Sequence, residues 1–187
     1  MAEAFSNKVV RSAGIVTSYS GSTVAAGSTA ITVTALTGIG VSFLVDNQHF
    51  IAGTKVVQTL PVSGGGTVFT DKNSTNTASA SSQTVKFLGP TTAYTSPAAT
   101  KSIIIGGTFA NNTNNSVNLT VEVYDTTVGV TSTGSVAIAS KIPVPSGSSF
   151  VISDTGKTLL EAGDELKVYC DTTDAVDVSL SILTGVN

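Results

Sequence analysis

The chain has 187 residues, of which only 11% are charged and 41% are hydrophobic, and its formal net charge is -3. Soluble proteins usually carry about a quarter of their residues as Asp, Glu, Lys and Arg, so this composition predicts a surface that partner molecules cover. A single histidine, a single cysteine and no tryptophan deprive most enzyme mechanisms of their usual groups, and Lys and Arg form no cluster that could follow a nucleic-acid backbone. We therefore expect a non-enzymatic protein that needs no cofactor and binds no nucleic acid.

Residues 1–27 are mostly small and polar, with scattered apolar positions. One interpretation is a frayed terminus followed by a first strand. The other is an N-terminal arm that becomes ordered on a neighbouring subunit and can be deleted without unfolding the rest of the chain. In that case the arm's apolar residues form the partner interface, and these are Phe5, Val9, Val10, Ile15 and Val16.

The same segment does not have the pattern of a secretory signal peptide. Glu3 stands where such a peptide is basic, and Lys8 and Arg11 interrupt its apolar core. No apolar stretch approaches the roughly 20 residues that span a bilayer. We expect synthesis in a host cytoplasm and no membrane partner.

From Thr29 onward the pattern predicts β-structure. The segment AITVTAL alternates apolar and polar residues, which is typical of a half-buried strand. Further short strands are expected at residues 41–45, 55–59, 67–70 and 84–88, with a hairpin loop at residues 64–66. Five short strands predict a small β-barrel or sandwich over residues 28–89.

Gly89 and Pro90 predict a domain boundary, because glycine frees the backbone and proline cannot donate to a sheet. Beyond it, VNLTVEVY (117–124) and VDVSLSIL (176–183) alternate clearly. Other strands are expected near Tyr94 and at residues 103–109, 135–142, 149–153, 157–160 and 166–170. About eight strands over residues 90–187 predict a jelly-roll or immunoglobulin-like sandwich. Since no window shows helical periodicity, the predicted fold class is all-β.

Few residue patterns suggest a chemical site. His49 follows Asp46 by three positions but has no nucleophile motif beside it, so a loop histidine with local hydrogen bonds is expected. Carboxylates recur at Asp171, Asp174 and Asp177, yet their spacing is not that of a calcium loop, and we expect solvated turn residues and no metal. Cys170 is expected to be a small buried hydrophobe.

The run of asparagines at residues 111–115 is expected to form a hairpin turn, with a carbohydrate-contacting loop as the alternative. Asparagine favours such turns because it tolerates left-handed backbone conformations.

Several segments resemble those of the β-sandwich virion proteins of tailed bacteriophages, especially marine cyanophages. The similar segments are IPVPSGSSF (142–150), LEAGDELKV (160–168), VDVSLSIL (176–183), LVDNQHFIAGTKV (44–56) and STNTASASSQTV (74–85). The resemblance implies a structural part of the virion, such as a capsid decoration (cement) protein. Such a protein would bind the major capsid protein or other virion proteins, as a homo-oligomer for which a trimer is favoured.

Two alternatives remain open. A neck, tail or fibre component of the virion has the same compositional features as a cement protein. A carbohydrate-binding module for a host surface belongs to a different class, and it would normally stack aromatic rings on sugars. This chain has four tyrosines for that purpose and no tryptophan.

Overall fold

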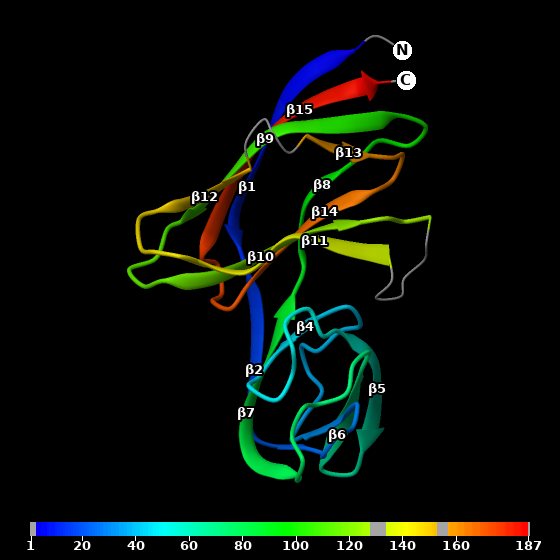
Figure 1. Ribbon diagram of the computed structural model, residues 1–187, viewed down its shortest axis with the longest axis vertical. Coiled ribbons are helices and arrows are strands. Elements are labelled where there is room, and N and C mark those ends of the chain that lie inside the picture. The colour runs from blue at the N-terminus through cyan, green and yellow to red at the C-terminus, as the bar shows by residue number, and fades with distance from the viewer. Residues whose placement is uncertain (1–2, 128–133, 153–156, 187) are drawn as a thin grey trace. The chain divides into compact units, whose positions relative to one another are not determined.

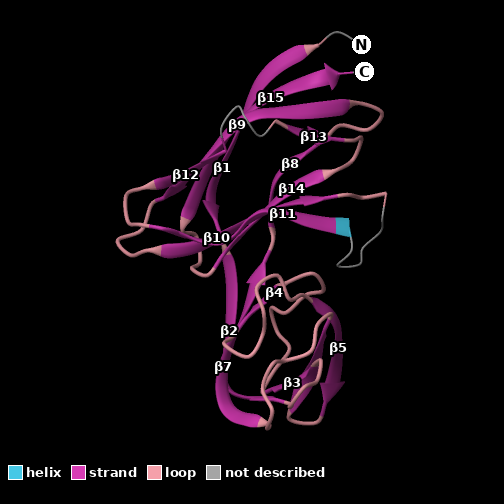
Figure 2. Ribbon diagram, viewed as in Figure 1, coloured by secondary structure: helices cyan, strands magenta, loops and turns pink. Residues whose placement is uncertain are grey.

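The computed structural model describes residues 3–127, 134–152 and 157–186, and within these ranges the chain forms strands and no α-helix. The cyan segment in Figure 2 marks 3-10 geometry at Gly134. The predicted all-β fold class is confirmed. The chain forms two compact units: the first joins residues up to Gly14 with those from Thr91 onward, and the second is Ile15–Pro90.

The first unit has two antiparallel sheets, and its strands are labelled in Figure 1. They are β1 (Ala4–Ala13), β8 (Thr91–Thr95), β9 (Lys101–Asn111), β10 (Val117–Tyr124), β11 (Ser135–Val144), β12 (Ser149–Ile152), β13 (Thr158–Leu160), β14 (Glu165–Cys170) and β15 (Val176–Val186). The first sheet has the order β1-β15-β9-β12, with β13 also paired to β9, and the second has the order β11-β10-β14-β8.

Successive strands of this unit pass from one sheet to the other at most connections, as between β8 and β9, β9 and β10, β11 and β12, and β14 and β15. The first and last strands of the unit, β1 and β15, lie side by side in one sheet. A five-stranded and a four-stranded sheet connected in this way form a β-sandwich with the strand order of a jelly roll, one of the two predicted sandwich types.

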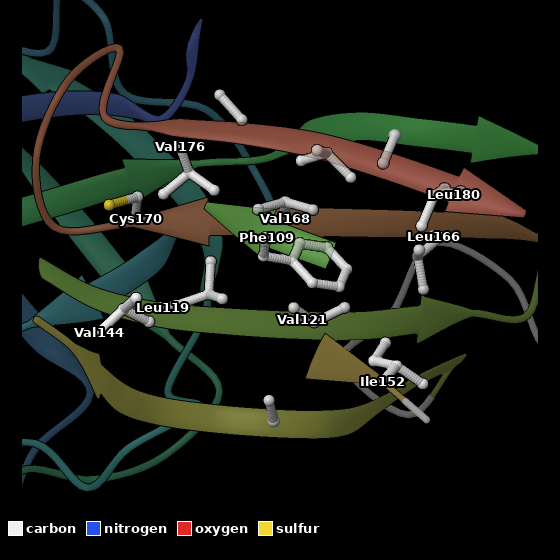
Figure 3. Packing of buried hydrophobic residues seen from close by; sticks show 14 of the residues in the cluster. Phe109, Leu119, Val121, Val144, Ile152, Leu166, Val168, Cys170, Val176 and Leu180 are labelled. Atoms are coloured by element: carbon white, nitrogen blue, oxygen red, sulfur yellow. The ribbon is translucent and has the colours of Figure 1, made fainter. Parts of the chain in front are cut away.

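The core of the first unit lies between its two sheets (Figure 3). Phe109 from β9 and Leu180 from β15 meet Leu119 of β10 and Leu166 of β14, and each is at most 1% exposed. Along β9 and β15 the buried residues largely alternate with outward-facing ones, so their sheet has one apolar inner face. Leu160 and Leu166 are both buried, on either side of the turn at residues 161–164.

The second unit is one curled antiparallel sheet with the order β4-β7-β2-β3-β6-β5. Its strands are β2 (Ile15–Val24), β3 (Ala30–Val33), β4 (Leu44–Asp46), β5 (Val56–Val62), β6 (Gly65–Thr70) and β7 (Ala80–Gly89). The two end strands approach each other: the Val56 N–H donates to the Phe43 carbonyl at 2.9 Å, and Leu44 bridges to Lys55. The sheet thus curls toward a barrel around Val24, Ile31, Phe87 and their neighbours, which is consistent with the small barrel or sandwich predicted from short strands.

The structure differs from the prediction that residues 1–27 form an arm. Residues 4–13 are strand β1 of the first unit, paired along β15, and residues 15–24 are strand β2 of the second unit, paired with β3 and β7. The second unit is therefore an insertion between two strands of the first. Its end at Pro90 coincides with the predicted boundary, whereas its beginning at Ile15 lies well before the predicted one at residue 28.

The insertion can be tested by excision. Ile15 pairs with Gly89, so the two ends of the second unit are adjacent, and the Gly14 N–H donates to the Thr91 hydroxyl at 3.3 Å, so the ends of the first unit are adjacent as well. We expect a fragment of residues 15–90, and a chain in which a short Gly-Ser linker joins Gly14 to Thr91, each to fold on its own with one cooperative transition. Thermal melts followed by circular dichroism measure this. Two fragments without any transition would show instead that the units need each other.

Candidate interaction surface

The five predicted interface residues belong to two different units and, within the first unit, to two different faces. Phe5 and Val9 are exposed on the outer face of β1, at 77% and 68% of their surface. Val10 points to the opposite face and packs against the core of the first unit. Ile15 and Val16 belong to β2 in the second unit. The structure therefore brings only Phe5 and Val9 onto one face.

Phe5 begins a row of four large apolar side chains that crosses the first sheet. It is paired with Leu183 of β15, Leu183 with Ile103 of β9, and Ile103 with Leu159 of β13. Residues directly opposite on neighbouring strands have side chains on the same face, with Cβ atoms about 4.5–5.5 Å apart. Leu159 is 50% exposed, and Leu183 and Ile103 are partly exposed. This set, Phe5, Leu183, Ile103 and Leu159, is called here the apolar row.

A second row runs parallel to the first and begins at Val9. Val9 is paired with Ser179, Ser179 with Thr108, and Thr108 with Val151 of β12, which is 55% exposed. On β1, β15 and β9, the residues between the two rows include Asn7, Ser181 and Gly106, which are small or neutral polar residues. A partner that covers these three residues removes no charged group from water.

A shallow hollow of about 320 Å³ lies beside Val9 on this outer face. It is lined by Val9, Val10, Arg11, Thr108, Ala110, Asp177, Val178 and Ser179. The Asp177 carboxylate accepts the Ser12 backbone N–H at 2.8 Å, which fixes the irregular end of β1 against β15. The hollow has the size to receive a side chain that protrudes from a partner.

The outer face of the second sheet has the opposite character. Lys167 lies 3.0 Å from the Glu165 carboxylate and 3.7 Å from the centroid of the Tyr124 ring. Tyr169 is buried, and this burial, together with the negative charge of Glu122, raises the pKa of its hydroxyl well above the usual value. On this face Lys167 and Glu165 therefore neutralise each other as an ion pair.

The histidine, the cysteine and the glycine-rich loop singled out in the sequence lie in turns and strands of the structure. His49 lies in a turn, and its own backbone N–H donates to the side-chain oxygen of Asn47 at 2.9 Å. This is the local hydrogen bonding expected of a loop histidine. Cys170 is completely buried in β14, as predicted. The Ser63–Gly64 turn joins β5 to β6 as a hairpin, with Gly64 in the left-handed region at φ 79°.

The three aspartates do not form one group. Asp171 accepts the backbone N–H and the side-chain amide of Asn118 at 2.9 and 2.7 Å, and Asp177 binds Ser12, so these two carboxylates fix different strands and are not merely solvated. No cluster of three or more His, Cys, Asp or Glu side chains suited to a metal occurs in the part of the chain that the structure describes.

The asparagine run connects two sheets and does not form a hairpin. β9 belongs to the first sheet and β10 to the second, so the prediction of a hairpin turn is wrong. Asn111 organises the connection: its amide nitrogen donates to the carbonyls of Asn115 and Val144 at 2.7 and 2.9 Å. The Asn111 amide is buried and its nitrogen already donates two hydrogen bonds, so it holds the connection between the sheets in place and cannot bind a sugar.

Comparison with models of protein families and with curated protein sequences finds no match for this chain. The resemblance to phage virion proteins therefore remains an expectation from the quoted segments. Among the described residues, no helix has the length and apolar character required to cross a membrane.

Proposed function

We propose that this chain is a non-enzymatic structural protein of a bacteriophage virion, a capsid decoration (cement) protein that binds the major capsid protein. The observation that supports it best is the outer face of the first sheet, where the apolar row from Phe5 to Leu159 is left partly or largely exposed. Exposed apolar patches on a well-packed domain mark interaction sites. The jelly-roll topology is also one that viral capsid domains use, which is support by analogy.

The proposed role is mechanical. A shell packed with DNA is under outward pressure, and a protein bound across subunit boundaries adds contact area that must be broken before the shell opens. Each Å² of apolar surface covered contributes about 25 cal/mol. A rigid sandwich suits this role because its outer face keeps one shape, and little conformational entropy is lost on binding.

Substitutions on the exposed ends of the two rows test the proposed surface. Val151→Asp combined with Leu159→Asp places two charges on the outer face of β12 and β13, and neither side chain is part of the core. We expect at least a tenfold loss of occupancy on purified particles, because an unpaired charge in a buried interface is costly. Quantitative mass spectrometry of particles produced with the variant chain measures the occupancy.

Val136→Asp is the matched control, since Val136 is an exposed valine on β11 of the other sheet. Circular dichroism should show all variants folded. Equal occupancy for the double variant and the control would rule out this face as the contact. Copy number in the particle separates a head protein from a neck, tail or fibre component, which is present in far fewer copies.

The carbohydrate-binding alternative has its own test, because jelly rolls also occur in lectins. A glycan array probed with the whole chain should show no specific binding if the protein is a cement. Specific binding that the double variant retains would favour host-surface recognition.

A further inference from the structure

Strand β1 leaves one long edge of the first sheet open. It has ten residues and pairs with β15 alone among the described strands. Its residues 4–9 are all exposed. The backbone N–H and C=O groups on its free side are thus positioned to pair with a strand of another chain, as open sheet edges commonly do.

The other edge strands of the sheets are short, or they contain or adjoin a proline, which cannot donate a hydrogen bond to a neighbouring strand. Pro61 lies within β5 and Pro143 within β11, while Pro90 and Pro97 flank the five-residue strand β8. The opposite edge of the first sheet is formed by β12 and β13, with four and three residues. All five prolines of the chain lie in or near these other edge strands, and β1 has none.

We propose that β1 is a self-association edge, at which two copies of this chain pair antiparallel about a two-fold axis through Asn7. Two-fold pairing places residue i opposite residue j of the second copy at a constant sum of the two numbers. With Asn7 on the axis, Phe5 lies opposite Val9 of the second copy, and Val9 opposite its Phe5. The exposed apolar residues of β1 therefore contact one another in two symmetric cross-strand pairs.

Charge complementarity selects this register. It places Glu3 opposite Arg11 of the second copy, and the symmetry repeats this ion pair at the other end of the contact. Both residues are exposed, and Arg11 lines the same hollow as Val9, so it lies on the outer face. Shifting the axis to Lys8 would instead place Lys8 opposite itself and Phe5 opposite Arg11, which brings like charges together and gives the ring a charged neighbour. Shifting it to Ser6 would place Glu3 opposite Val9.

Lys8 is compatible with the pairing about Asn7. A charged residue in an edge strand usually discourages pairing, but here Lys8 faces Ser6 of the second copy and lies on the inner side of the sheet, near Tyr94 and Thr95 of β8. Lys8 therefore opposes the register about Lys8, in which it would face itself, and does not oppose this one.

The contact joins the two first sheets into one and leaves their outer faces uncovered. The apolar row of one copy continues through Phe5 into Val9, Ser179 and Thr108 of the second copy. This inference stands independently of the proposed virion role, because it concerns the strand edge and not the face. It specifies a two-fold contact, whereas the sequence resemblance favours a trimer.

Charge reversal at the two ends of the contact is the decisive experiment. The native chain should sediment at about twice its 18.8 kDa mass at micromolar concentration. Glu3→Arg alone and Arg11→Glu alone should each raise the dimer dissociation constant about tenfold or more, since two attractive pairs become repulsive. Mixing the two variants should restore the dimer, because every pair in the mixed dimer is again of opposite charge.

Restoration on mixing cannot come from a folding defect, so it isolates the contact. A native chain that is monomeric at high concentration, or a trimer whose mass both variants leave unchanged, would overturn the proposal. Failure here would leave the proposed virion role intact, because that role is tested by Val151 and Leu159 on other strands.

A cysteine pair tests the register. Asn7→Cys places two thiols opposite each other on the axis, so mild oxidation should give a disulfide-linked dimer. Ser181→Cys is the matched control: Ser181 lies beside Asn7 on the same exposed face but one strand further from the axis, and it should remain unlinked. Native Cys170 is buried in both variants. Equal cross-linking of the two variants would overturn the register.

Discussion

Deletion of residues 1–27 is expected to unfold both units. The deletion removes β1, which pairs with β15 from Ala4 to Ala13, and β2, which lies between β3 and β7 in the second sheet. Without β2 the curled sheet of the second unit is divided in two. We expect the loss of the whole free energy of folding, about 5–15 kcal/mol for each unit. Far-ultraviolet circular dichroism during a thermal melt should show no cooperative transition.

Removal of residues 1–3 is the control, because these residues precede β1. At a concentration where the chain is monomeric, that variant should melt like the full chain. An arm that orders only on a neighbour would behave differently: residues 28–187 would then form a stable protein, and such a result would contradict the strand assignments at the N-terminus.

Replacement of Phe109 by alanine is expected to destabilise the first unit by about 3–5 kcal/mol. The ring is completely buried between the two sheets (Figure 3). Its centroid lies 5.9 Å from that of the Phe150 ring on β12. Its removal therefore leaves a cavity and also breaks an aromatic contact. Urea unfolding followed by circular dichroism measures the change in the free energy of unfolding.

Phe5→Ala removes the same ring from an exposed position, and at a concentration where the chain is monomeric it should change stability by less than about 0.5 kcal/mol. The second unit has its own core and should unfold unchanged in both variants. If Phe109→Ala and Phe5→Ala had equal effects, Phe109 would not be the centre of the core.

The strands that the sequence predicts best are those with one buried face. VNLTVEVY lies in β10 with its apolar residues directed inward, and VDVSLSIL lies in β15 with Val176, Val178, Leu180 and Ile182 directed inward. Strand β1 was harder to predict because nearly all its side chains are exposed, so no alternation marks a buried face. Its position depends on backbone hydrogen bonds to β15, whose residues are more than 160 positions away in the sequence. Local patterns do not contain that information.

The candidate surface could be predicted only in part. Phe5 and Val9 stand out as apolar residues in a polar segment. Ile103 and Leu159 do not, because Ile103 begins a run of three isoleucines and Leu159 is followed by the buried Leu160. Which member of such a run faces outward follows from the strand register, and the row from Phe5 to Leu159 exists only when four strands are aligned.

The position of this chain in a purified phage particle is the measurement on which the proposed function depends. Cryo-electron microscopy with quantitative mass spectrometry gives both location and copy number. We expect the first unit at boundaries between major capsid subunits, in a copy number comparable to theirs, with the apolar row turned toward the shell. Absence of the chain from particles, or a bound chain whose apolar row faces solvent, would contradict the proposal.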